Sequence, residues 1–145
     1  MFEPIIKLGR KNVVAMVHVP ALPGSPDFNP AAGMNRIIDS VVADLEALQS
    51  GGVDAVMFGN EFDRPYVLKA PPEGLAALAA VIGQVKSIIK VPFGVNYLWD
   101  PLATVALAIA TEANFAREIY TGVYASDMGF WTPDCAGAAR MRASH

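Results

Sequence analysis

Four short apolar runs, each ending abruptly in polar residues, constrain the fold of this 145-residue chain more than any other feature. They cover residues 13–17, 53–58, 91–95 and 115–116, and the intervals between them contain alanine-rich stretches with helical spacing. This rhythm is typical of (β/α) units around a parallel sheet. Such sheets place chemistry at the carboxyl ends of their strands, where these polar residues fall. The pattern therefore predicts both the fold class and the edge of the sheet that would carry a site.

The number of units is four, whereas a closed (β/α)₈ barrel of the TIM type needs about 250 residues. We expect one α/β domain over residues 1–145 that forms about half of such a barrel, with strands at about 12–19, 53–58, 91–97 and 115–120. Residues 1–11 read as a lead-in with a short helix, and residues 133–145 as a divergent tail. The hydrophobic fraction of 53% and the mean hydropathy of +0.34 are high for a small soluble domain. Apolar surface meant for an opposing half barrel would explain both values.

Helix boundaries carry clear local signals. The apolar spacing predicts a helix over residues 34–49 that Gly51 and Gly52 end. Proline at residues 71–72 opens the next helix, and Asp100-Pro101 reads as an N-cap followed by a first-turn proline. Residues 121–132 read as a loop, and Thr132-Pro133-Asp134 as the start of a last helix.

Composition excludes several classes of protein. No run approaches about 18 uninterrupted apolar residues, so we expect no membrane span, and the first ten residues show no secretory signal. The single Cys135 excludes an internal disulfide, reads as an inert thiol, and fits a reducing cytosol. The net charge is −3, without a basic stripe for nucleic acid. These features predict a cytoplasmic protein that does not bind nucleic acid.

Two strand-end residues are candidates for proton transfer. His18 could be a proton shuttle or metal ligand, or a structural histidine beneath the proline-rich loop of residues 20–26. Glu61 could be a general base, a metal ligand or an acceptor for sugar hydroxyls. The alternative for Glu61 is an ion pair with Arg64 or Arg117. We take His18 and Glu61 as candidate catalytic residues.

Five further residues are candidates for ligand binding: Asn60, Asn96, Arg117, Glu118 and Asp127. The Asn96 amide both donates and accepts, which suits a hydroxylated ligand, although it could instead be a polar plug between barrel layers. Arg117 could pair with Glu61 or bind an anionic group. We expect Asp127 to lie at the same rim.

Other polar and aromatic signals are weaker. Asp63 and Arg64 read as solvated loop charges. The aromatic residues at positions 97, 99, 124, 130 and 131 could line a sugar or base pocket, but packing explains most of them more simply. The glycines form neither a P-loop nor a GxGxxG pattern. We assign no residue to a metal and name no cofactor.

Four segments carry a resemblance to a known family. They are HVPALPG at 18–24, GGVDAVMF at 51–58, PFGVN at 92–96 and YTGVYASD at 120–127. These segments resemble the BtpA family, and NEF at 60–62 and LWDP at 98–101 look most like its SgcQ branch. The likeness runs from about residue 12 to 132, in order and without gaps.

The resemblance implies a (β/α)₈ barrel of the phosphate-binding type. SgcQ-like members sit among sugar-uptake and carbohydrate genes, which implies binding of, or action on, a phosphorylated or nucleotide-linked sugar or a nucleoside. In that interpretation Glu61 or His18 would move protons, and Arg117 and Asn96 would orient the ligand. Isomerisation, aldol chemistry and glycosidic cleavage all remain open. The alternative is a non-enzymatic assembly factor, as in photosystem I biogenesis, for which BtpA is named.

The chain departs from the family in its length. Family members continue into a second half, and the usual phosphate-binding loops follow strands seven and eight. Residues 135–145 no longer resemble the family, as a frameshift or gene truncation would produce. We expect open edges at the first and fourth strands, and an inner face with candidate contributors Met16, Val56, Met57, Phe93, Val95 and Ile119. Leaving about 1000 Å² of that face wet would cost on the order of 25 kcal/mol. The sequence thus predicts a homodimer that closes a pseudo-barrel, or an aggregation-prone chain with little activity.

Overall fold

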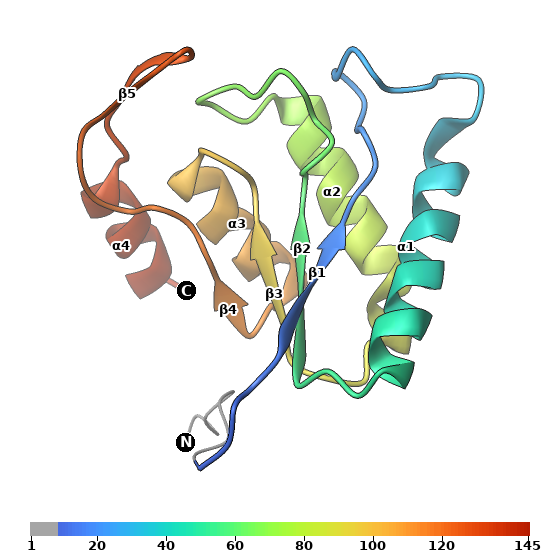
Figure 1. Cartoon of the computed structure of the whole chain (residues 1–145). Helices are drawn as coiled ribbons and strands as arrows, with labels where there is room; N and C mark the ends of the chain where they lie inside the picture. Colours follow the sequence, from blue (N-terminus) through green and yellow to red (C-terminus); the bar gives the residue numbers. More distant parts are fainter. Residues whose placement is uncertain (1–8) are drawn as a thin grey trace.

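A four-stranded parallel sheet forms the centre of the molecule (Figure 1), and the computed structural model describes residues 9–145. Its strands are β1 (Val14–His18), β2 (Ala55–Gly59), β3 (Phe93–Asn96) and β4 (Phe115–Ala116), in the order β1-β2-β3-β4. All three pairings are parallel. The predicted α/β fold, with four (β/α) units of a TIM-type barrel, is confirmed. The helix expected within residues 1–11 falls on positions that lie mostly outside the described residues.

Three helices follow the first three strands and pack beside one another (Figure 1). They are α1 (Gly33–Ser50), α2 (Pro72–Val85) and α3 (Pro101–Thr111), and a short 3₁₀ turn, η1 (Lys86–Ile88), extends α2. The last helix, α4 (Cys135–Ala143), packs against α3. Each helix begins close to the residue that the sequence indicated.

Helix α3 begins where its local sequence predicts. The Asp100 carboxylate accepts a hydrogen bond of 3.0 Å from the backbone N–H of Ala103, and Pro101 occupies the first turn. The same carboxylate accepts a bond of 2.9 Å from the N–H of Ala70, which ties the β2–α2 loop to α3. Asp134 caps α4 in the same way, by accepting from the Gly137 N–H at 2.8 Å. The predicted cap at Asp100 and the predicted helix start at residues 132–134 are confirmed.

Alternate strand residues face the helices and form the hydrophobic core. The strands and the residues directly after them contribute Val17, Val19, Val56, Phe58, Phe93, Val95 and Tyr97 to this core. They pack with helix residues such as Ile37, Val41, Leu45, Leu78, Ile82 and Leu107. Because side chains alternate along a strand, the register that aligns Val56 with Phe93 puts both on this side. Our assignment of Val56, Phe93 and Val95 to the inner face was therefore wrong.

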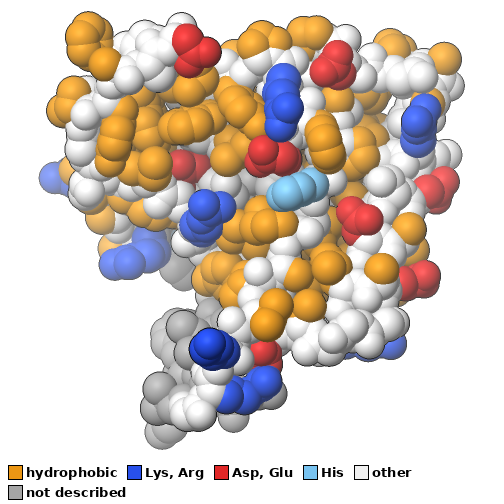
Figure 2. Space-filling model, viewed as in Figure 1, with side chains coloured by type: hydrophobic (Ala, Val, Ile, Leu, Met, Phe, Trp, Pro, Cys, Tyr) orange, Lys and Arg blue, Asp and Glu red, His pale blue; other side chains and the backbone are white. Residues whose placement is uncertain are grey.

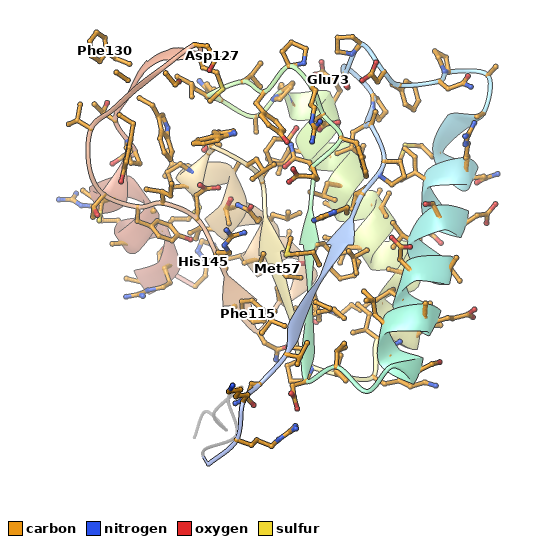
Figure 3. The ribbon with its side chains drawn as sticks, in the orientation of Figure 1. Met57, Glu73, Phe115, Asp127, Phe130 and His145 are labelled. Carbon is orange, nitrogen blue, oxygen red and sulfur yellow. The ribbon has the colours of Figure 1, made fainter. Side chains whose placement is uncertain are left out.

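The inner face, meaning the sheet face turned away from the helices, is better covered than the sequence suggested. Phe115 lies against Gly94 so closely that a Cβ atom on Gly94 would overlap its ring. The Met16 methyl group approaches Gly59, at 3.5 Å from the position of a Cβ there. Met57 lies on the same face and is only 2% exposed. Figure 3 shows Met57 and Phe115 near the middle of the sheet.

The chain after β4 differs from the prediction. We expected a strand over residues 115–120 and a loop over 121–132, but β4 contains only Phe115 and Ala116. The segment that follows folds into an antiparallel hairpin of β5 (Tyr124–Ser126) and β6 (Gly129–Trp131), which stands apart from the main sheet (Figure 1). Trp131 is 5% exposed, whereas Phe130 is 82% exposed. The hairpin is therefore anchored on one side only.

The early end of β4 has a cause in α3. The Arg117 N–H still donates to the Val95 carbonyl at 3.1 Å, so pairing with β3 extends that far. Beyond it, the Thr104 hydroxyl of α3 accepts from the Tyr97 N–H at 2.9 Å and donates to the Tyr97 carbonyl at 3.1 Å. The Asp100 N–H also donates to that carbonyl. Because Thr104 and Asp100 already bond the N–H and the carbonyl of Tyr97, the chain after Arg117 cannot use these groups to extend the pairing of β4 with β3.

Among the described residues, no helix combines the length and the apolar character that crossing a membrane requires. Figure 2 shows hydrophobic side chains over much of the viewed surface, with Lys, Arg, Asp and Glu scattered among them. No charge of a single sign dominates that view.

Candidate functional site at the carboxyl ends of the strands

Strand register brings the predicted site residues to one edge of the sheet. His18 pairs with Gly59, and Gly59 pairs with Asn96, so the ends of β1, β2 and β3 are level. Ala116 pairs with Val95, which places Arg117 at the same level on the neighbouring segment. In a parallel sheet all these ends open on one side. Together, His18, Asn96 and Arg117 form what we call the strand-end row.

Asn96 and Glu118 form the closest polar pair at this edge. The Asn96 side chain is 2% exposed, and its Nδ2 donates to Glu118 Oε2 at 2.5 Å. Glu118 also accepts from the backbone N–H groups of Trp99, at 3.2 Å, and Ile119, at 2.9 Å. Burial raises the pKa of Glu118, although these hydrogen bonds and the charge of Arg117 act in the opposite direction. A carboxyl group with a raised pKa keeps its proton to a higher pH than an ordinary glutamate does, which favours a role as a proton donor.

Arg117 and His18 are the solvent-facing members of the strand-end row. Both are exposed. The His18 ring meets Phe62 edge to face, with a distance of 6.3 Å between ring centroids. An exposed guanidinium beside a half-buried carboxylate can bind an anionic group without first breaking a buried ion pair.

Glu61 has local partners instead of Arg117. The Tyr66 hydroxyl donates to Glu61 Oε1 at 3.1 Å, and Arg64 Nη2 lies 3.5 Å from the same oxygen. Of the two ion pairs that the sequence allowed, the structure forms the one with Arg64. Glu61 is half-buried, so it stays accessible at the rim of the β2–α2 loop.

Asn60 joins the β2–α2 loop to the end of β3. Its side chain is 3% exposed, its Oδ1 accepts from the Leu98 N–H at 2.8 Å, and its Nδ2 donates to Asp63 Oδ2 at 3.2 Å. By alternation from Gly59, Asn60 lies on the helix side of the sheet and Asn96 on the inner side. The structure therefore places the two asparagines on opposite sides of the strand tips.

Asp63 was wrongly expected to be a solvated loop charge. It is half-buried and accepts from the Leu22 N–H at 2.7 Å, which connects the loops that follow β1 and β2. Burial raises the pKa of Asp63 against the effect of its hydrogen bonds to Leu22, Asn60 and Tyr97. The spacing Asn60-x-x-Asp63 directly after a buried strand is the signal that could have identified it.

Trp99 has an unusual environment. Its backbone is in the left-handed region, with φ of 72°, which costs a non-glycine residue about 1–3 kcal/mol. Its ring meets Trp131 edge to face at 5.2 Å between centroids, and Tyr66 lies 6.4 Å away on the same measure. Over residues 9–145, its buried indole Nε1 finds no hydrogen-bond partner. These contacts fix the β3–α3 loop against the β5–β6 hairpin.

Asp127 is exposed in the turn between β5 and β6. Figure 3 shows it at the end of the molecule that also carries Glu73, above the strand tips. It lies at the end of the sheet that we expected, but on the hairpin and not on a loop.

Comparison with known proteins shows the family of this chain. The family model described as the BtpA family matches residues 9–144. The chain belongs to the BtpA family. The matched range includes the whole of the last helix, α4, as well as the four strands and the helices between them.

Several relatives place the chain within this family. The sgc region protein SgcQ of Escherichia coli K12 is 60% identical over 121 residues, which cover 83% of this chain and 45% of that protein. An uncharacterized protein of Pyrococcus abyssi is 33% identical over 94% of this chain and 52% of its own length. The photosystem I biogenesis protein BtpA of Synechocystis is 29% identical over 81% of this chain and 41% of its own length. The chain spans about half the length of the curated relatives it matches. No solved structure matches it at a significant level.

A cavity of about 240 Å³ lies next to the strand-end row in this BtpA-family chain. The loops that follow β1 and β2 and the end of β3 line it, with Asn60, Asp63 and Tyr97 contributing polar atoms. Within residues 9–145, no three or more His, Cys, Asp or Glu side chains group closely enough to hold a metal ion. The chemistry that these side chains offer is hydrogen bonding, proton exchange and anion binding.

Proposed function

We propose that the strand-end row of this protein binds, and in a complete barrel acts on, a phosphorylated or nucleotide-linked sugar. The observation that carries the proposal is the Asn96–Glu118 pair beside the exposed Arg117. The pair combines a buried amide with a carboxyl group of raised pKa, and the guanidinium supplies a positive charge next to it. The resemblance to the SgcQ branch of the BtpA family, which implies a role in carbohydrate metabolism, supports the sugar as ligand.

Each residue has a role that follows from its position. Arg117 would hold the phosphate or diphosphate group, and Asn96 would orient a sugar hydroxyl. Glu118, with its raised pKa, and the exposed His18 would exchange protons with the ligand. Glu61 would assist from the rim, where Tyr66 and Arg64 already hold its carboxylate. The reaction class stays open among isomerisation, aldol chemistry and glycosidic cleavage.

A thermal-shift screen tests this proposal. The 145-residue chain would be melted with glucose 6-phosphate, ribose 5-phosphate, uridine diphosphate glucose and adenosine. A ligand at 100 times its dissociation constant stabilises a protein by about 2.7 kcal/mol, which shifts the melting temperature of a domain of this size by several degrees. We expect Arg117→Gln to abolish the shift. Arg36→Gln, a matched change of an exposed residue on α1, should leave it unchanged.

The alternative function is that of an assembly factor. The observation in its favour is the exposed apolar surface of the hairpin region, where Val123 is 72% and Phe130 is 82% exposed. A scaffold of this kind would not need the Asn96–Glu118 pair. If none of the four ligands shifts the melting temperature in an Arg117-dependent way, the assembly role becomes the better explanation.

A further inference from the structure

The cavity behind the strand tips has the size of a small ligand. Its volume of about 240 Å³ is equivalent to about eight water molecules at their share of liquid volume. It lies on the helix side of the strand tips, as Asn60 and Tyr97 do, whereas Asn96 of the strand-end row lies on the inner side. The cavity is therefore separate from the strand-end row.

One hydroxyl in the cavity wall has no partner. Ser25 lines the cavity, and its Oγ atom is buried without a hydrogen bond to any described residue. Buried hydroxyls are almost always satisfied, because leaving one unpaired costs stability. The atom has almost no accessible surface in the position observed, so a rotation about the Ser25 Cα–Cβ bond is needed before a ligand hydroxyl in the cavity can satisfy it as both donor and acceptor.

Further polar groups lie in the same wall. The Asp63 carboxylate already bonds Leu22, Asn60 and Tyr97, which leaves it capacity for about one more donor. The Asn60 amide has one N–H left after its bond to Asp63. The wall thus presents a hydroxyl, an amide N–H and carboxylate oxygens, which suit the hydroxyls of a polyol.

The charges around the cavity disfavour an anionic ligand. Its lining includes Asp63 but neither Lys nor Arg. The pKa of Tyr97 is strongly raised, first by burial and then by the negative charges of Asp63, Glu73 and Asp100. A phosphate would meet these carboxylates without a compensating cation.

The rest of the wall is apolar and stiff. Pro23, Pro26, Pro65 and Pro71 line the cavity together with Tyr66. Proline rings restrict the backbone, so the walls are pre-formed, and ring C–H surfaces of a sugar pack well on such groups.

We propose that this cavity is a binding site for an uncharged, hydroxyl-bearing ring of the size of a free pentose or hexose. Ser25, Asp63 and Asn60 bond its hydroxyls, and the prolines and Tyr66 pack on its C–H face. The site recognises the ring without a phosphate, so it does not depend on Arg117 or on the strand-end row.

Nuclear magnetic resonance titration tests the site directly. D-glucose and D-ribose would be added to the ¹⁵N-labelled 145-residue chain, and the backbone amides of Leu22 and Leu98 observed, because they donate to Asp63 and Asn60. We expect saturable shifts at both amides. Ser25→Ala should weaken binding about three- to tenfold, as the loss of one hydrogen bond does.

Ser25→Ala is the informative variant because it removes a hydroxyl that bonds no described residue, so the free chain should melt no lower than the unmodified one. Asp63→Asn is less useful, since it also disturbs the acceptor of the Leu22 N–H. Ser40→Ala, on the exposed side of α1, is the matched control and should bind as the unmodified chain does.

Three outcomes would overturn the proposal. The first is the absence of saturable shifts at Leu22 and Leu98 with either sugar. The second is binding that Ser25→Ala leaves unchanged. The third is tighter binding at these amides of glucosamine or glucose 6-phosphate than of glucose, since the site would then select a charge. Failure of the phosphorylated ligands to bind at Arg117 has no effect on this test.

Discussion

The two middle strands and the chain after β3 show how differently the same sequence pattern can fold. Every residue of β2 and β3 is buried, whereas both residues of β4 are only half-buried and all of β5 is exposed. The first three of these strands were signalled by apolar residues followed by polar ones, whereas β5 lies in a segment that we expected to be a loop. The middle strands have a partner on each side, and β4 has one on a single side. Neighbours on both sides thus accompany complete burial, whereas the outer strand β1, with one neighbour, is regular over five residues but only partly buried.

Pairing of β1 or β4 with a second copy of the chain would have the largest effect on this difference between middle and outer strands. In the sheet of residues 9–145, β1 and β4 are the two outer strands, and their backbone groups can pair with another chain. We expect the purified 145-residue chain to be at least a dimer, or to aggregate, in light scattering at micromolar concentration. The free energy gained on association should be well below about 25 kcal/mol, the cost of exposing the whole inner face to water, because Met57 on that face is already buried. A stable monomer would show that the edge strands need no partner.

Removal of an aromatic ring from each region gives the next largest effect. Phe58 is fully buried in β2 and meets Phe93 at 5.9 Å between ring centroids. We expect Phe58→Ala to lower the free energy of unfolding by about 3–5 kcal/mol, measured by urea denaturation. Phe130→Ala, at an 82% exposed position of β6, should stay within about 0.5 kcal/mol. Similar losses at both positions would mean that a partner buries the hairpin.

The junction between β3 and β4 should respond to a single methyl group. Gly94→Ala places a Cβ atom in the Phe115 ring, and such overpacking costs about 1–3 kcal/mol. The double variant with Phe115→Leu should recover part of that loss in the same denaturation experiment, because the smaller side chain makes room. If Phe115→Leu gives no recovery, Phe115 is not held over Gly94 in solution.

Thr104 tests why β4 ends early. Thr104→Val leaves the buried Tyr97 N–H without its acceptor, which should cost about 1–3 kcal/mol. Hydrogen exchange at the Tyr97 amide should become faster. Thr121→Val, at an exposed position, is the matched change and should have little effect. Unchanged exchange at Tyr97 would mean that the Thr104 hydroxyl does not hold this amide and does not determine where β4 ends.

The smallest effect concerns pH. Burial raises the pKa of Glu118, so the folded chain binds this proton more tightly than the unfolded chain does. Stability should therefore fall as pH rises from about 4.3, the ordinary glutamate value, through the raised pKa, and level off above it. Glu118→Gln should remove part of this slope in urea titrations across that range. Glu46→Gln, exposed on α1, should keep it; equal slopes in the two variants would contradict the assignment.

The starts of the helices were predicted well because the residues that determine each start lie next to it in the sequence. Asp100 and Pro101 lie next to the turn that they start, so the sequence alone contains the cap. The end of β4 was not predictable in this way, because Thr104 on α3 determines it through the Tyr97 backbone.

The candidate site likewise contains residues whose positions follow from local sequence and residues whose positions depend on distant contacts. The positions of His18 and Asn96 follow from strand periodicity and were predicted. The local spacing Asn60-x-x-Asp63 could have pointed to Asp63, but its bond to Leu22, which is 41 residues away in the chain, could not be read from any local pattern. The same holds for Glu61, whose choice of Arg64 over Arg117 is set by the course of a loop.

The contact between Trp99 and Trp131 has a consequence for spectroscopy. These are the two tryptophans of the chain, and they meet edge to face where the β5–β6 hairpin contacts the β3–α3 loop. Intrinsic fluorescence therefore reports on this contact, while far-ultraviolet circular dichroism reports on the helices over the sheet. If the hairpin detaches before the core unfolds, the fluorescence midpoint will precede the dichroism midpoint, and a two-state analysis of either curve alone will be invalid.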